Sequence, residues 1–179
     1  MLWRTLNYTL TDEQMNDAKK IGFDRCNAKD PDIRSNDSDY HDGDLGREFP
    51  HEMGAIAEVA FSAITGMKIN RELHSRSGDE CDFGLIELKS ASHIGDDIYL
   101  KVKMEEFDKK KTPQAYVLAR VTGNLVQFIG AIRRKKFEKV GFRRIFKSGG
   151  PLNFCATRSS LDLCLPYYDS DGKFMKISF

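Results

Sequence analysis

The fold class and the candidate functional site are both predicted from residues 79–91, DECDFGLIELKSA. Ile86 and Leu88 alternate with Glu87 and Lys89, and a period of two is typical of a β-strand. The strand therefore has an apolar face, which we expect to be buried, and a charged face. Burial of one face fixes which residues share each side, so Glu87 and Lys89 are expected to lie together.

A tight turn would bring a second carboxylate to the charged face. Gly84 tolerates the positive φ that begins a type II′ turn, so Gly84 and Leu85 are expected to form a two-residue hairpin loop. Counting outwards from this loop places Asp82 opposite Glu87. Cross-strand partners share a face, with Cβ atoms about 4.5–5.5 Å apart.

Two facing carboxylates repel each other unless a positive charge lies between them. A divalent cation with oxygen ligands would remove the repulsion, so a metal site is the first interpretation. The alternative is a solvated edge hairpin on which Lys89 pairs with Glu80. If the turn lies elsewhere, Asp79 or Glu80 would replace Asp82 as the ligand.

The length of 179 residues is that of one domain with a substantial core. Apolar residues make up 40% of the chain and charged residues 31%, as in a soluble globular protein. The net charge of +1 gives no global basic signature, so nucleic-acid binding would have to use local patches.

The four cysteines are scattered and form no C-x-x-C pair, which argues against structural zinc. We find no signal peptide and no apolar run of membrane-spanning length. A reduced, cytoplasmic protein without a membrane partner is therefore expected.

Two helices are expected before the hairpin. Thr11 and Gln14 fit a capping box, and apolar residues recur at helical spacing through residues 12–27, with the charged side chains facing solvent. Residues 29–49 form a long polar loop, whose aspartates do not match the spacing of an EF-hand.

The second helix is expected over residues 50–65, ended by Gly66. Glu58 falls at the margin of its apolar stripe, next to Gly54 one turn earlier. The absence of a side chain at Gly54 would let another element approach Glu58 closely.

The remaining elements are expected as strands over 98–104, 115–121 and 126–132, a helix over 133–140, irregular chain over 141–160, and short strands over 161–165 and 174–179.

A helical Glu58, then Asp82, then Glu87-Leu88-Lys89 on a strand, resembles the PD-(D/E)XK nuclease superfamily. The apolar strands that follow are similar to those of small phage-encoded and restriction-like members. The resemblance covers roughly residues 50–135. Two features depart from the pattern: no proline precedes Asp82, and only four residues separate it from Glu87.

The resemblance implies an α/β protein with a restriction-endonuclease-like α/β/α core, in which helices flank a central mixed sheet. One nuclease-like domain would span residues 1–179. It would comprise the 12–27 helix, the 29–49 loop, a catalytic core over 50–135 and a C-terminal extension over 136–179.

The resemblance also implies a Mg²⁺-dependent hydrolase of DNA, with Mn²⁺ able to substitute. Asp82, Glu87 and the carbonyl of Leu88 would bind the metal, and Glu58 would reach it directly, through water, or by holding a second ion. Lys89 would position the attacking water or stabilise the developing charge. Calling Lys89 a general base is less safe, because neighbouring carboxylates favour its charged form.

Basic side chains near this site would grip the phosphate backbone. They are Lys101, Lys103, Lys109 to Lys111, and Arg133 to Lys136. An endonuclease is the expected activity, and a homodimer is a plausible assembly because cutting two strands at once needs two sites. The alternatives are a nucleic-acid-binding or inhibitory module without turnover, and a structural domain whose charged hairpin is incidental.

Overall fold

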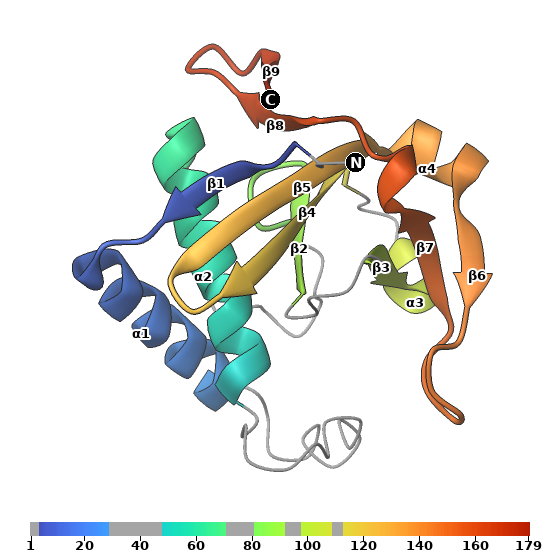
Figure 1. The fold of residues 1–179 in the computed structure, drawn as a ribbon, viewed down its shortest axis with the longest axis horizontal. Coiled ribbons are helices and arrows are strands. Elements are labelled where there is room, and N and C mark those ends of the chain that lie inside the picture. Colours follow the sequence, from blue (N-terminus) through green and yellow to red (C-terminus); the bar gives the residue numbers. More distant parts are fainter. Residues whose placement is uncertain (1–3, 29–47, 71–80, 92–97, 109–112) are drawn as a thin grey trace.

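The computed structural model describes residues 4–28, 48–70, 81–91, 98–108 and 113–179 (Figure 1). The described residues form a mixed α/β protein with four α-helices. The elements are, in order, β1 (Leu6–Thr9), α1 (Asp12–Ala28), α2 (Glu48–Thr65), β2 (Ile86–Ala91), β3 (Tyr99–Lys103), α3 (Met104–Phe107), β4 (Ala115–Thr122), β5 (Leu125–Arg133), α4 (Arg134–Val140), β6 (Phe142–Arg144), β7 (Asn153–Thr157), a 3₁₀ turn (Arg158–Ser160), β8 (Cys164–Tyr168) and β9 (Phe174–Ser178). Among these described helices, none is long and apolar enough to cross a membrane.

The main sheet is mixed, as expected, with the strand order β1-β5-β4-β2. β2 runs parallel to β4, whereas β4 and β5 form an antiparallel hairpin and β1 adds to β5. The continuous apolar run of β4 predicts a central strand, and most of its residues are buried. β2 is an edge strand of this sheet, so one of its edges is open to side chains from elsewhere.

A second, three-stranded sheet has the order β3-β7-β6 and lies beside the main sheet (Figure 1). The expectation of irregular chain over residues 141–160 is therefore wrong. β6 has three residues and β7 five, too few to show a clear period, and β7 is held by pairing with the distant β3. β8 and β9 form a separate hairpin.

Both long helices begin and end near the expected positions. The capping box of α1 is confirmed, because Gln14 N–H donates to Thr11 Oγ1 (3.2 Å) and Thr11 N–H donates to Gln14 Oε1 (3.0 Å). α2 begins at Glu48 rather than residue 50, since proline is tolerated in a first turn. It ends at Thr65, directly before Gly66, which adopts φ 72°.

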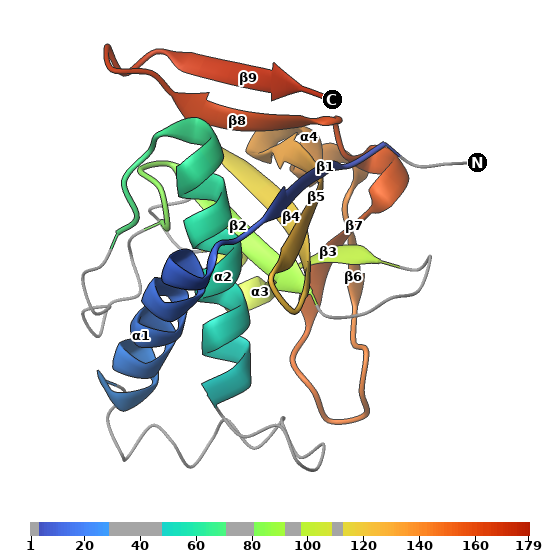
Figure 2. The same ribbon diagram turned by 60° about the vertical axis from the view of Figure 1, so that its left-hand side comes forward.

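α1 and α2 pack against each other and cover one face of the main sheet (Figure 2). They approach each other closely at Gly22, where an added Cβ would lie 2.8 Å from the Cα of Glu52. The role expected for Gly54 is therefore wrong, since an added Cβ there would meet nothing within 4 Å.

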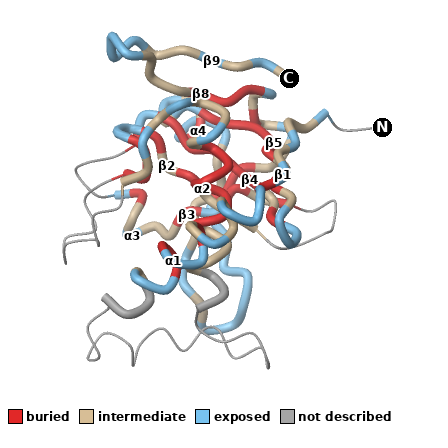
Figure 3. Tube along the Cα trace, turned by 90° about the vertical axis from the view of Figure 1, so that its left-hand side faces the viewer, coloured by how far each residue is buried: buried red, intermediate tan, exposed pale blue. Residues whose placement is uncertain are grey.

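The two faces of the main sheet bury two different clusters of apolar side chains. Ile86, Leu88 and Val117 pack with α1 and α2, whereas Tyr116 and Leu118 pack with β3, α3, α4 and β7. Figure 3 shows the buried residues concentrated along α2 and the strands of the main sheet. The alternation along β2 directs its charged residues away from α2, towards the side of the sheet where α3 lies.

Candidate active site

The turn that opens β2 has the expected two-residue loop. Phe83 N–H donates to the carbonyl of Ile86 (3.1 Å), and Ile86 N–H donates to the carbonyl of Phe83 (2.9 Å). Gly84 adopts φ 61°, as the first position of a type II′ turn requires. The apolar alternation is also confirmed, because Ile86 is fully buried and Leu88 nearly so.

Asp82, however, does not continue the hairpin ladder opposite Glu87, so that part of the expectation is wrong. The ladder ends at the Phe83–Ile86 pair, and Cys81 pairs with Gly84 instead. The Asp82 carboxylate turns to the open edge of β2, where its Oδ2 accepts from the N–H of Leu88 (2.8 Å). An edge N–H that is buried needs an acceptor, and this carboxylate supplies it.

Glu58 lies in a buried segment of α2 rather than at the margin of an apolar stripe, and it is 4% exposed. Arg25 of α1 binds it with two hydrogen bonds, Nη1 to Oε1 (2.6 Å) and Nη2 to Oε2 (2.7 Å). Arg25 Nη2 also donates to the carbonyl of Asn70 (3.2 Å). Burial raises the pKa of Glu58, and the guanidinium opposes that rise.

The prediction that the charged residues of α1 face solvent is wrong for Arg25. Its side chain is only 10% exposed, and although burial works against its charge, Glu58 outweighs that effect and raises the pKa. A signal was present in the sequence, because Arg25 follows the buried Ile21 by four residues and Gly22 by three. That spacing places it on the inward side of the helix.

Lys89 lies between two carboxylates on the charged face of β2. Its Nζ is 2.8 Å from Glu87 Oε1 and 3.1 Å from Glu106 Oε2 of α3. Burial opposes the charge of Lys89, but the two glutamates outweigh it and raise its pKa. The lysine is therefore an ammonium at neutral pH. No pattern in the sequence marked Glu106, because it enters the site only through the packing of α3 beside β2.

Asp82 and Glu87 both retain protons more readily than ordinary carboxyls. Burial, and then the charge of Glu58, raise the pKa of Asp82 to about 7. Burial, and then the charge of Asp82, raise the pKa of Glu87 to about 7. These interactions show that Glu58, Asp82 and Glu87 share one electrostatic site, although they come from three separate segments.

The charges at this site do not balance. Among the described residues, the carboxylates of Glu58, Asp82, Glu87 and Glu106 are bonded to or paired with two cations, those of Arg25 and Lys89. Arg25 is bonded to Glu58 and Lys89 to the two other glutamates, so neither cation is bonded to Asp82. The excess negative charge is therefore concentrated beside Asp82 and Glu87.

A divalent cation of the Mg²⁺ type fits Asp82 and Glu87 better than it fits the full carboxylate set. Within the described ranges, no three His, Cys, Asp or Glu side chains are arranged as a metal-binding group. Both oxygens of Glu58 are engaged by Arg25. Mg²⁺, however, typically uses one or two carboxylates, with waters and substrate phosphates as its other ligands. The Leu88 carbonyl points to the same edge as its N–H, towards Asp82.

Four of the basic residues expected to bind DNA, Lys101, Lys103, Arg133 and Arg134, are not all brought together. Lys101 and Lys103 lie on β3, on the outward side of the second sheet. Arg133 stacks on Phe174 of β9, 4.5 Å from guanidinium carbon to ring centre. Arg134 instead lies on the face of the main sheet that carries Lys89; its side chain is 17% exposed.

Arg134 is held close to the carboxylate site. Its Nη1 donates to the hydroxyl of Tyr116 (2.9 Å), and its guanidinium lies 3.4 Å from the ring centre of Phe107. Tyr116 is the strand partner of Glu87. Arg134 therefore lies beside the site, and its guanidinium is paired with Glu138 (2.7 Å). Lys109 to Lys111, the alternative ligands Asp79 and Glu80, and most of the 29–49 loop lie outside the described residues.

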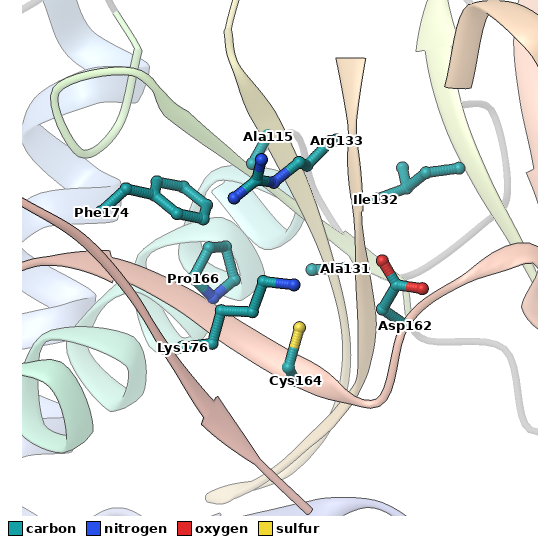
Figure 4. A pocket seen from close by; sticks show the side chains of 9 residues that line it. All are labelled: Ala115, Ala131, Ile132, Arg133, Asp162, Cys164, Pro166, Phe174 and Lys176. Atoms are coloured by element: carbon teal, nitrogen blue, oxygen red, sulfur yellow. The ribbon is translucent and has the colours of Figure 1, made fainter. Parts of the chain in front are cut away.

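A small hollow between β5 and the β8-β9 hairpin is a separate feature (Figure 4). Arg133, Cys164 and Lys176 line it, and its one acidic residue, Asp162, is paired with Lys136 (2.7 Å). None of the carboxylates described above lines this hollow. Cys81, Cys155 and Cys164 are all buried free thiols.

No protein-family model, curated protein or solved structure matches this chain. The function is therefore inferred from the side chains described above.

Proposed function

We propose that this protein is a Mg²⁺-dependent nuclease that hydrolyses phosphodiester bonds of DNA and has a restriction-endonuclease-like fold. The observation that carries the proposal is the electrostatic coupling of the buried Asp82 to the half-buried Glu87, which pairs with the protonated Lys89 (2.8 Å). Burying like charges costs free energy, and such arrangements are concentrated at functional sites.

The chain contributes two ligands and a cation to this chemistry. Asp82 and Glu87 would hold the metal, with the Leu88 carbonyl beside them. A bound Mg²⁺ supplies an activated water and neutralises charge on the phosphoryl group. Lys89 is charged, so it would donate hydrogen bonds to a phosphoryl oxygen or to the attacking water rather than accept a proton.

Glu58 has a different role in this proposal. Because both of its oxygens accept from Arg25, it fixes the guanidinium between α1 and the segment that contains Asn70. It also raises the pKa of Asp82 by repulsion. Glu58 is thus a positioning residue, and it would become a metal ligand only if Arg25 moved away.

The second candidate is a nucleic-acid-binding module without turnover. The basic residues Lys101, Lys103 and Arg144 on the second sheet favour binding in either case. A module that only binds a polyanion gains nothing from unbalanced carboxylates, since they repel phosphate. The carboxylate site therefore favours the nuclease.

The test is cleavage of supercoiled plasmid and of linear DNA in Mg²⁺ or Mn²⁺, with EDTA as the metal-free control. We expect the wild type to cut, and Asp82→Asn and Lys89→Met each to reduce the rate by more than about 100-fold, since even outer-shell partners of metals contribute about 10–100-fold. Asp162→Asn and Lys136→Met are matched controls, because they remove the same groups from an exposed ion pair elsewhere.

Nicked circles would identify an endonuclease. Persistent cutting by Asp82→Asn at the wild-type rate would show that the activity belongs to another site. Intact DNA in every wild-type reaction, combined with salt-dependent binding, would favour the module without turnover.

A further inference from the structure

The outward side of the β3-β7-β6 sheet carries aromatic and basic side chains in alternation with buried ones. Along β3, Leu100 and Val102 are buried, so Tyr99, Lys101 and Lys103 project from the opposite side. In the ladders, Cys155 of β7 lies between Lys101 and Phe142, and Asn153 lies between Lys103 and Arg144. We call this surface the aromatic–basic face. It consists of Tyr99, Lys101 and Lys103 of β3, Phe142 and Arg144 of β6, and Phe146, which follows β6.

The rings and cations of this face contact one another directly. The ring centres of Phe142 and Phe146 lie 5.9 and 5.8 Å from that of Tyr99. Lys101 Nζ lies 3.9 Å above the ring of Phe146, and the guanidinium of Arg144 lies 4.9 Å from the same ring. Arg144 also lies 5.4 Å from the ring centre of Tyr99, so both Phe146 and Tyr99 have a cation beside the ring.

The charge of this region differs sharply from that of the whole chain. Residues 141–160 contain no aspartate or glutamate, but they contain Arg143, Arg144, Lys147 and Arg158. β3 adds two lysines and no acid. The chain as a whole has a net charge of only +1. The positive charge is thus concentrated on one part of the surface, and it complements a polyanion.

The exposure of Phe146 indicates that this aromatic cluster does more than form a small hydrophobic core. Phe146 is 38% exposed, its neighbour Ile145 54%, and Leu152 in the same loop 40%. A ring that only held β6 in place would gain most from complete burial. An exposed ring with adjacent cations, as at Phe146, is instead what proteins use to stack unpaired bases while gripping phosphates.

We propose that the aromatic–basic face binds single-stranded DNA, with bases stacked on Phe146 and Tyr99 and phosphates held by Lys101, Lys103 and Arg144. Duplex DNA hides its base faces, so these rings would add little to its binding. The proposal rests on the proposed function in one respect: the bound strand would be the substrate of the carboxylate site.

The two sites are joined by a short piece of chain. Lys103 directly precedes α3, and α3 carries Glu106, which contacts Lys89 (3.1 Å). The end of β3 is thus connected to the carboxylate site through α3. The geometry favours cleavage of single strands, or of the single-stranded part of a junction.

The experiment is fluorescence anisotropy with a labelled 20-nucleotide strand and with the duplex of the same sequence, using the full chain in EDTA so that cleavage is excluded. The wild type should bind the single strand more tightly than the duplex. Phe146→Ala should weaken single-strand binding by between about 5-fold and 100-fold, the range for one lost stacking contact. Lys101→Ala should lower the slope of log K against log salt by about 0.7.

Phe23→Ala and Lys19→Ala on α1 are matched controls, because each removes an exposed side chain of the same type from another face. Both should bind like the wild type. Thermal melting of every variant separates lost contacts from lost folding, and Tyr99→Leu, which keeps apolar volume without an aromatic ring, serves as a second variant.

Equal or tighter binding of duplex would overturn the proposal, as would unchanged single-strand binding by both Phe146→Ala and Tyr99→Leu. Failure of the nuclease proposal gives a different result. In that case single-strand binding and its sensitivity to Phe146→Ala persist, while Mg²⁺ produces no cutting of any substrate.

Discussion

Glu58 and Asp82 are both buried carboxylates of one electrostatic site, but the protein treats their charges differently. Glu58 has its own cation, bound through two short hydrogen bonds from Arg25. Asp82 has a backbone N–H and no directly bonded cation among the described residues. The charge of Glu58 is therefore balanced by a side chain of the protein itself. No cation of the described residues is bonded to Asp82, so under the proposed function this carboxylate, and not Glu58, is the metal ligand.

The largest effect on stability should come from breaking the Arg25–Glu58 ion pair. Arg25→Ala leaves Glu58 buried without its cation, and removal of one partner from a buried pair costs about 3–5 kcal/mol. For a chain of this size, 1 kcal/mol corresponds to about 2–4 °C in Tm, so thermal melting should show a drop of at least about 6 °C.

The double variant Arg25→Met with Glu58→Leu is the control for this effect. Replacing both partners with apolar side chains should recover most of the lost stability. A drop of only one or two degrees in Arg25→Ala would contradict the view that the pair is structural.

The second largest effect on stability should come from binding of Mg²⁺ at Asp82 and Glu87. Mg²⁺ at about 100 times its Kd should stabilise the wild type by about 2.7 kcal/mol, since it binds only the folded protein. The rise in Tm should be larger at pH 8 than at pH 6, because Asp82 and Glu87 must lose protons that they hold up to about pH 7. Asp82→Asn should remove the rise, and an equal rise in that variant would place the metal elsewhere.

The third effect concerns the metal-free protein, where Asp82→Asn should stabilise. The pKa values of Asp82 and Glu87, about 7, lie above those of the unfolded chain, near 4. The folded protein therefore binds more protons between about pH 4 and pH 7, and its free energy of unfolding falls as pH rises through that window. Well above pH 7 both carboxyls are deprotonated in the folded and in the unfolded chain, so the free energy of unfolding falls no further.

Asp82→Asn should recover at least about 1 kcal/mol of this loss at pH 8 and almost none at pH 4, since one pKa unit corresponds to about 1.4 kcal/mol. Chemical denaturation in EDTA at both pH values measures the difference. Asp162→Asn is the control, because its carboxylate is about half exposed and paired with Lys136. Destabilisation by Asp82→Asn at pH 8 would show that the Leu88 hydrogen bond outweighs the repulsion.

The smallest effect on stability should come from Glu106→Gln. Its carboxylate is 37% exposed, and such pairs contribute about 0–1 kcal/mol. Lys89 keeps Glu87 as a partner (2.8 Å), so the fold should be unchanged. Because Glu106 helps to orient Lys89, the cleavage rate should still fall by about 10-fold or more. An unchanged rate would mean that Glu87 alone positions the lysine.

Much of the local structure could be predicted from the sequence. The capping box at Thr11 and Gln14, the turn at Gly84, the apolar face of Ile86 and Leu88, and the buried strand β4 all depend on residues close together in the chain. Local patterns report the period of a strand or helix and the φ angles that a turn requires, because both are set by neighbouring residues.

Only the tertiary structure decided which charged side chains bond to each other. It joined Arg25 to Glu58 across 33 residues and Lys89 to Glu106 across 17, turned Asp82 from Glu87 to the N–H of Leu88, and built the second sheet from β3, β6 and β7. Such contacts depend on how separate elements pack, and no periodicity within one segment encodes them. Residue types and spacing thus determined that carboxylates gather near β2, whereas packing determined which of them remains without a bonded cation.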